Sequence, residues 1–446
     1  MNPIGLLILI FLVLVISFGS REWVALGMVA GVLYLTEGQQ IDLAGFNFFA
    51  IRFLELAGFI RIVLKGELPR VRINSIDKSF LVFQSVYLLM FLIGFSVHPG
   101  AIVMPTYMIG FFCDGLISYF IFRALLTDPP VFRNFLKKSA YLIIPFTALM
   151  MIESITGHNL FSFMGGVPAV PVIRNGHYRA QGSFRVAITA GSFGATLFPL
   201  FVGEALAYGR RFWNLTGAVA CVMITIAAHS GGPVMALAAG FIAWFCWRIR
   251  GHMRMVRWGM FISFVALALV MKAPVWFVID RVSGIVGGHG WDRANLINQF
   301  VNHFSNWWLT GMTLENTANW AATRLTFGST DVVDTYVYIG LTGGLISLVL
   351  FIRFLVECFR SLGSSMRFVR TPEGDHTHEL LLWGIGCCLF SNVVNLIGVT
   401  YFDQMYVIWY MTLAVVSSLT AYYLGESRAK DQEEAYDPEG GLYDVS

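Results

Sequence analysis

The chain has 446 residues, of which 57% are hydrophobic, 15% aromatic and 13% charged. Its mean hydropathy of +0.68 excludes a water-soluble globular protein of this length. Basic and acidic residues number 30 and 27, a formal net charge of +3, so the composition indicates no nucleic-acid partner. We therefore expect one membrane domain built from helices, because helices satisfy their own backbone hydrogen bonds in lipid.

Apolar segments of roughly 17–25 residues, the length that crosses a bilayer, recur along the chain and predict an all-α fold with 12 or 13 transmembrane helices. The first, from residue 3, lacks the features of a cleaved signal peptide and is expected to remain as a span. The third carries Arg52, Glu55 and Arg61, so it either crosses the membrane or lies partly in the interface. Arg52 and Glu55 share a helical face and are expected to pair. The segments lie near residues 3–19, 22–36, 41–64, 79–97, 101–125, 138–156, 186–208, 212–228, 232–248, 257–279, 336–356, 379–400 and 404–424.

Basic residues gather in alternate loops, which the positive-inside rule places in the cytoplasm. This orientation leaves two long loops outside, at 157–185 and 280–335. The membrane domain would then span residues 1–424, and the polar tail 425–446 is expected to be cytoplasmic and disordered. The basic loop residues are Lys65, Arg70, Arg72, Lys78, Arg133, Lys137, Lys138, Arg210, Arg211, Arg248, Arg250, Arg254, Arg257, Arg360, Arg367 and Arg370.

The two external loops contain arginine but no lysine. Arginine forks suit bidentate phosphate recognition, although snorkelling to lipid headgroups is the simpler explanation. For Arg179 and Arg293 we favour an anion site, and the segment 280–335 resembles a lid over it. Its other polar and aromatic residues include His289, His303, Trp291, Trp307, Trp308, Trp320 and Arg324, and the remaining external arginines are Arg174, Arg185 and Arg281.

The sequence contains no phosphate-binding loop, hydrolase nucleophile motif or zinc-protease motif. None of its six cysteines lies in an external loop, and no metal-ligand spacing occurs. A reaction here would depend on positioning and on electrostatic stabilisation of a leaving group. A lipid-linked diphosphate fits that requirement, and no metal or other cofactor is expected.

Three stretches resemble the superfamily of O-antigen ligases and O-antigen or exopolysaccharide polymerases. The first runs from Arg179 to Phe184 (RAQGSF) and leads into a glycine-containing helix. The second begins at Asp292-Arg293 and ends in the turn NWWLTG at Gly311. The third reads DVVDTY from Asp331 and continues into a helix with Gly340, Gly343 and Gly344. A weaker similarity is HSGGP at 229–233, where relatives often show S-R-G.

The resemblance implies transfer of a glycan from undecaprenyl diphosphate to a hydroxyl group. By position, Arg179 and Arg293 would hold the diphosphate, with Arg281 as a further ligand. Ligases often carry a His-Asn pair at the positions of Val333 and Asp334, and Gly231 replaces the arginine of S-R-G.

The identity of the general base therefore stays open among Asp331, Asp334, His303 and Glu315. Trp320 and Tyr336 are candidates for glycan binding. The simpler roles are a helix N-cap for Asp334, a satisfied interfacial histidine for His303, and an aromatic-belt residue for Trp320.

These features together predict a polymerase of undecaprenyl-diphosphate-linked oligosaccharide repeats in the bacterial inner membrane. Its partners would be the lipid-linked substrate, membrane lipid, and a chain-length regulator or flippase of the same pathway. Val333, in place of histidine, favours a polymerase over a ligase. A transporter or flippase is the alternative of another class, but it would favour internal repeats with broken helices in both halves, and no clear repeat occurs. A scaffold would leave the external arginines unexplained.

Overall fold

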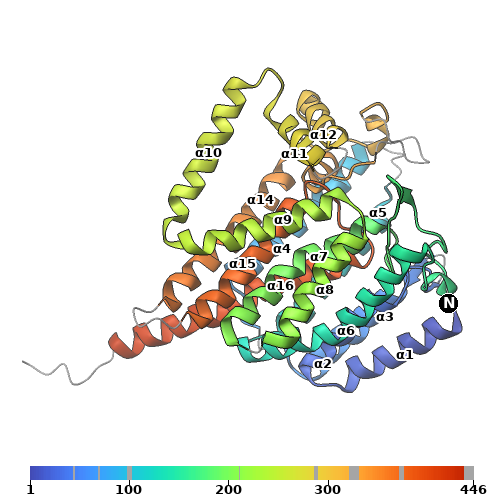
Figure 1. The fold of residues 1–446 in the computed structure, drawn as a ribbon. Coiled ribbons are helices and arrows are strands. Elements are labelled where there is room, and N and C mark those ends of the chain that lie inside the picture. Colours follow the sequence, from blue (N-terminus) through green and yellow to red (C-terminus); the bar gives the residue numbers. More distant parts are fainter. Residues whose placement is uncertain are drawn as a thin grey trace, which may run out of the picture.

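The computed structural model describes residues 1–43, 46–68, 71–97, 103–209, 211–285, 290–320, 331–370 and 376–435. Within these residues the chain is a bundle of helices with two short hairpins (Figure 1). The first half contains α1 (Pro3–Phe18), α2 (Arg21–Tyr34), β1 (Gln40–Leu43), β2 (Phe46–Phe49), α3 (Ala50–Leu64), α4 (Ser75–Val97), α5 (Pro105–Leu125), α6 (Pro129–Thr156), η2 (Ser162–Met164), β3 (Ile173–Arg174), β4 (His177–Tyr178), α7 (Ala187–Tyr208) and α8 (Arg211–Ala227). The second half contains α9 (Gly231–Phe245), η3 (Cys246–His252), α10 (Met253–Val270), η4 (Val275–Phe277), α11 (Val278–Ile285), α12 (Trp291–Asn302), α13 (Phe304–Trp307), η5 (Leu314–Thr317), α14 (Thr335–Val369), α15 (Thr377–Asn395) and α16 (Met405–Ala435).

Eight helical stretches in the described part of the chain are long and apolar enough to cross a membrane. One of them, Gly231–Val270, runs through α9, η3 and α10, and the shorter apolar helices are Pro3–Phe18 and Phe212–Ala227. The chain is therefore a multi-pass α-helical membrane protein. α10 has no buried residue and stands apart from the bundle in Figure 1, so its apolar surface is left for lipid.

Several helix boundaries differ from the predicted spans. The apolar segment expected to be helical from residue 41 begins instead as the antiparallel pair β1–β2, and α3 starts at Ala50. The three phenylalanines of β2 (FNFF) suit a strand as well as a span. At the other end, α16 continues to Ala435, so residues 425–435 are helical where disorder was expected. Residues 436–446 lie outside the described part.

The ion pair expected within α3 does not form. Arg52 instead forms an ion pair with Asp114 of α5, in which Nη2 lies 2.8 Å from Oδ2. Glu55 accepts a hydrogen bond from Oγ of Ser118, also on α5, at 2.5 Å. Charged groups within a membrane protein seek partners across helices, so α3 uses both charges to attach to its neighbour.

Small residues allow the central helices to approach closely. A Cβ atom at Gly194 of α7 would lie 2.3 Å from the carbonyl oxygen of Cys221 on α8. At Gly191 it would lie 2.8 Å from Cβ of Ala228. These two glycines of the predicted glycine-containing helix thus place the backbones of α7 and α8 in contact, as small residues do in membrane bundles.

α14 is broken near its beginning at Gly344, where φ is 72° and ψ 179°. The turn after α13 fills the break: the N–H of Leu345 donates to the carbonyl of Trp308 at 2.8 Å, and the N–H of Met312 donates to that of Leu341 at 2.6 Å. Backbone groups released by the break are thereby satisfied within the protein. This contact attaches the 290–320 segment, which contains short helices as expected, to the bundle.

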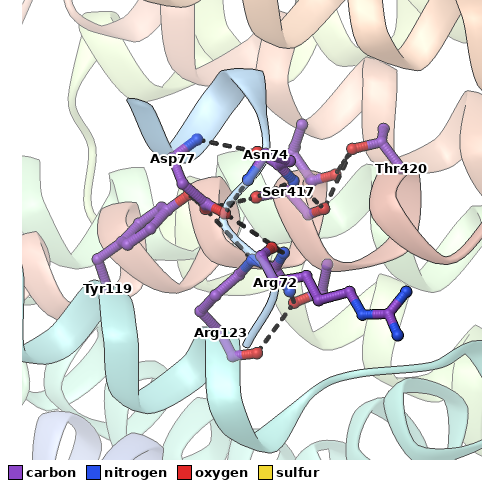
Figure 2. A network of polar contacts seen from close by, with 9 residues as sticks. Arg72, Asn74, Asp77, Tyr119, Arg123, Ser417 and Thr420 are labelled. Atoms are coloured by element: carbon purple, nitrogen blue, oxygen red, sulfur yellow. Dashed lines mark hydrogen bonds and ion pairs between the residues drawn. The ribbon is translucent and has the colours of Figure 1, made fainter. Parts of the chain in front are cut away.

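A buried polar network joins the first turn of α4 to α5 and α16 (Figure 2). Asp77 is completely buried, and its Oδ1 lies 3.2 Å from Nε of Arg123. The same oxygen accepts hydrogen bonds from Tyr119 at 2.6 Å and Ser417 at 2.7 Å. Asn74 exchanges hydrogen bonds with Asp77 at the helix start. A carboxylate with this many donors is tolerated in the interior because its charge is paired.

Candidate functional site in an arginine-lined cavity

A cavity of about 1110 Å³ runs between α2, α3, α4, α5, α14 and α16. One part is aromatic and lies between the helices, with Phe80, Tyr87 and Phe354 among its walls. The other part is bounded by loops and by α12, and it is strongly charged. The charged lining residues are Glu37, Arg52, Asp114, Arg174, Arg179, Arg185, Asp292, Arg293, Asp331 and Asp403.

The β3–β4 hairpin supplies two of these arginines. Its turn is Asn175-Gly176, both with positive φ (52° and 78°), as a two-residue type I′ hairpin turn requires. Arg174 pairs with His177 in the register, and the N–H of Arg179 donates to the carbonyl of Val172 at 2.9 Å. Because side chains alternate along strands, Arg174 and Arg179 emerge on the same face of the hairpin.

Hydrogen bonds and packing fix the RAQGSF stretch, which begins at Arg179. Glu153 of α6 accepts hydrogen bonds from the backbone N–H groups of Gln181 at 3.0 Å and Gly182 at 2.7 Å. Gly182 has a φ of 59°, and a side chain there would strike the ring of Phe146. The glutamine, the glycine and the buried Phe184 thus fix the loop that carries the arginine.

Arg179 itself reaches the segment between α8 and α9. Its Nη2 donates to Oγ of Ser230 at 3.2 Å, within the HSGGP stretch. Its Nε is buried and donates no hydrogen bond to any described residue. Of the described side chains, no carboxylate forms a salt bridge with Arg179.

Arg293 enters the cavity from the first turn of α12. Its Nη2 donates to the carbonyl of Gly398 at 3.4 Å, and a Cβ atom at Gly398 would lie only 3.3 Å from its Nε. Gly398 belongs to the loop between α15 and α16. The absence of a side chain there leaves room for the guanidinium.

Three guanidinium groups converge at this end of the cavity. Burial, and after it the charges of Arg174 and Arg293, lower the pKa of Arg179 to about 10. The pKa of Arg293 is also lowered, first by burial and then by Arg174, while Asp292 and Asp334 oppose the shift. These arginines are partly desolvated and repel one another. Binding of an anion with several oxygens is therefore favourable at this end of the cavity.

Three of the eight residues proposed from the sequence line this cavity: Arg179, Arg293 and Asp331. Asp334 does not line it. Its carboxylate is buried and caps α14, with Oδ1 accepting from the N–H of Val337 at 3.0 Å. The geometry therefore supports the simpler role considered for Asp334.

The other four predicted residues also lie outside the cavity lining. Arg281 is exposed on α11. His303 contacts the carbonyl of Gln299 at 2.8 Å and stacks on Trp320. Trp320 is only 4% exposed and packs in a second hydrophobic cluster with Phe300 and Trp307. Tyr336 donates to the carbonyl of Val393 at 3.0 Å. Their catalytic and binding roles remain predictions, while His289 and Arg324 lie outside the described residues.

Two acidic residues of the cavity, Glu37 and Asp403, were not singled out from the sequence. They lie in short segments after α2 and before α16, 366 positions apart in the chain. The positive φ of 50° at Asp403 is visible only in the folded backbone. No motif links the two residues, so sequence reasoning had no signal for their proximity.

Within the described residues, no group of three His, Cys, Asp or Glu side chains is placed to hold a metal ion.

No family model matches the chain, and no curated protein matches it.

Proposed function

We propose that this protein polymerises undecaprenyl-diphosphate-linked oligosaccharide repeats on the external face of the bacterial inner membrane. The observation that carries the proposal is the convergence of Arg179 and Arg293, together with Arg174, on one end of a large cavity. The first two arginines belong to separate stretches that resemble the polymerase and ligase superfamily. Arg174 and Arg185 join them on the cavity wall.

In the proposed reaction, an acceptor hydroxyl attacks the anomeric carbon of the lipid-linked donor. The new bond forms between the acceptor oxygen and that carbon as the bond to the diphosphate breaks. The diphosphate leaves with the bonding electron pair, and the arginines stabilise its charge. The hydroxyl proton passes to a base, and the configuration at the anomeric carbon inverts. The chemistry requires no covalent enzyme intermediate.

The test uses cells that lack the protein and are re-supplied with wild type, Arg179→Ala, Arg293→Ala or Arg281→Ala. Loss of one preorganised donor to the leaving group is expected to reduce turnover by about 10²–10³. The first two variants should therefore accumulate single repeats on the external leaflet. Arg281→Ala tests the third arginine predicted for the diphosphate, and a smaller effect is expected because Arg281 is exposed and does not line the cavity. Full-length polymer from both Arg179→Ala and Arg293→Ala would refute the assignment.

A ligase would use the same donor and leaving group. In that case the deletion cells would instead accumulate long chains that remain on the lipid carrier. The position of Val333, where ligases often carry histidine, favours the polymerase.

A transporter is a second candidate, and the depth of the cavity favours it. The cavity reaches Phe80 of α4, one turn beyond Asp77, and the ring of Phe80 packs on Tyr119 with centroids 4.2 Å apart. Phe80, Phe83 and Phe354 line the cavity, and the Asp77–Arg123 pair lies outside its lining. Single repeats trapped on the cytoplasmic leaflet of deletion cells would establish transport and exclude polymerisation.

A further inference from the structure

Two carboxyl groups face the same cavity as the arginines. Glu37 and Asp403 both line it, and their side chains are 19% and 11% exposed. The two carboxyl groups are neighbours, because Nη1 of Arg185 lies within 4 Å of both. Burial, and after it the hydrogen bond and charge of Glu37, raise the pKa of Asp403 to about 9. Oδ2 of Asp403 is buried and receives no hydrogen bond from another described residue.

Hydrogen bonds from the side chain of Gln404 hold together the segments that carry this pair. Its amide nitrogen donates to the carbonyls of Val32 and Leu35 at the end of α2, at 3.3 and 3.4 Å. It also donates to the carbonyl of Ser183 at 3.1 Å. One side chain thus ties together the segments that carry Glu37, Arg185 and Asp403.

Arg185 lies near both carboxylates of the pair but forms no close hydrogen bond with either. Its Nη1 lies 3.7 Å from Oε2 of Glu37 and 3.8 Å from Oδ1 of Asp403, beyond ordinary hydrogen-bond distance. The arginine side chain is 59% exposed. The charges of both carboxylates act on Tyr107, and Arg52 and Asp114 line the same cavity.

The pair is also close to the anion end. Gly398, whose carbonyl contacts Arg293, precedes Asp403 by five residues, so their Cα atoms are at most about 18 Å apart even if the chain were extended. Asp403 also holds a positive φ of 50°, a conformation that is uncommon for residues other than glycine and that clusters at functional sites.

We propose that the Glu37–Asp403 pair is the base that accepts the proton of the acceptor hydroxyl. This inference rests on the proposed function and supplies the group that the sequence left open. The hydroxyl oxygen bonds to the anomeric carbon, its proton moves to a carboxylate oxygen of the pair, and the diphosphate leaves toward the arginines. Asp331, the other cavity carboxylate considered from the sequence, is exposed and has no acidic partner in the described structure.

The experiment uses the full chain in lipid nanodiscs, with lipid-linked repeats extracted from cells that lack it. Turnover and binding of undecaprenyl diphosphate are measured for wild type, Asp403→Asn, Glu37→Gln and Asp331→Asn. Asparagine tolerates the positive φ of Asp403 but cannot accept the proton. We expect turnover of Asp403→Asn and Glu37→Gln to fall by about 10²–10⁴, the contribution typical of general bases. Binding of undecaprenyl diphosphate by these two variants should be unchanged, and Asp331→Asn tests the other cavity carboxylate considered as a base.

A second variant, Asp403→Gly, makes the test independent of folding defects. Glycine keeps the positive φ and leaves space beside the anomeric carbon. Azide needs no deprotonation, so it should restore donor consumption by this variant and yield the glycosyl azide. In that step a carbon–nitrogen bond forms as the bond to the diphosphate breaks.

The outcomes separate the two proposals. If wild type neither extends nor consumes the lipid-linked repeat, the proposed function fails, and this inference fails with it. If wild type is active but Asp403→Asn and Glu37→Gln keep its rate, only the inference is overturned. It is equally overturned if these variants lose diphosphate binding together with turnover, because the pair would then be structural. A selective loss in Asp331→Asn would assign the base to Asp331 instead.

Discussion

Burial shifts the pKa of a single carboxyl group, that of Asp334, enough to affect stability. Asp334 is 2% exposed, and burial raises the pKa of its carboxyl group to about 7, against the opposing effects of hydrogen bonds from Val337 and Tyr336 and the charge of Arg293. Folding therefore favours the protonated form of this N-cap. Its stabilising contribution is complete below the unfolded-state pKa of about 3.9 and is lost as the pH rises through about 7.

This shift predicts a pH-dependent difference between wild type and Asp334→Asn. Asparagine caps a helix as well as aspartate does but does not titrate. The thermal midpoint of the wild type should thus fall relative to that of the variant between roughly pH 4 and pH 7. Tryptophan fluorescence of the detergent-solubilised proteins would measure both midpoints, and a difference that stays constant with pH would contradict the shift.

Arg179 offers a second test at the residue scale. Arg179→Lys keeps the positive charge but removes the planar fork that suits a diphosphate. The expected loss of one charge-assisted hydrogen bond is about 1.5–3 kcal/mol, or roughly tenfold to hundredfold in turnover. Extension of lipid-linked repeats by the purified protein would measure it. Wild-type turnover by Arg179→Lys would mean that charge alone is sufficient at this position.

At the scale of the element, the break in α14 decides how the 290–320 segment attaches to the bundle. Gly344 adopts a backbone conformation (φ 72°, ψ 179°) that is essentially restricted to glycine. A Cβ atom there would lie 2.6 Å from the carbonyl oxygen of Leu309. The same helix continues through Gly363, where a Cβ atom would meet nothing within 4 Å.

These two glycines form a matched pair of test positions. Gly344→Ala should destabilise the protein by about 1–3 kcal/mol and loosen the turn at 308–312. Gly363→Ala should stabilise it by roughly 0.5–1 kcal/mol, since it only favours the helix. Thermal midpoints in detergent, with hydrogen exchange of the 308–312 amides, would report both effects. Equal effects of the two substitutions would show that the break is not required.

At the scale of the whole molecule, the Asp77 network connects helices from both ends of the chain. Asp77 and Arg123 come from α4 and α5, and Ser417 comes from α16 (Figure 2). Removal of one partner of a buried ion pair leaves an uncompensated charge, which typically costs 3–5 kcal/mol, whereas replacing both partners by apolar residues is often tolerated.

Asp77→Ala should therefore destabilise the protein by about 3–5 kcal/mol, and the double variant Asp77→Leu with Arg123→Met should recover much of that loss. Denaturation in mixed detergent would compare the two with wild type. If the double variant is as unstable as the single one, the network contributes through its hydrogen bonds and not through charge compensation.

The sequence by itself determined the membrane class, most helix positions and two arginines of the cavity. Hydropathy and charge patterns carry that information because each is a property of contiguous residues. Only the tertiary structure placed Arg174, Glu37 and Asp403 on the same cavity wall, moved Arg52 from Glu55 to Asp114, and buried Trp320 in a hydrophobic cluster. Those outcomes depend on contacts between segments far apart in the chain. Local patterns do not encode such contacts, because the partner of a charged or aromatic side chain is chosen by packing.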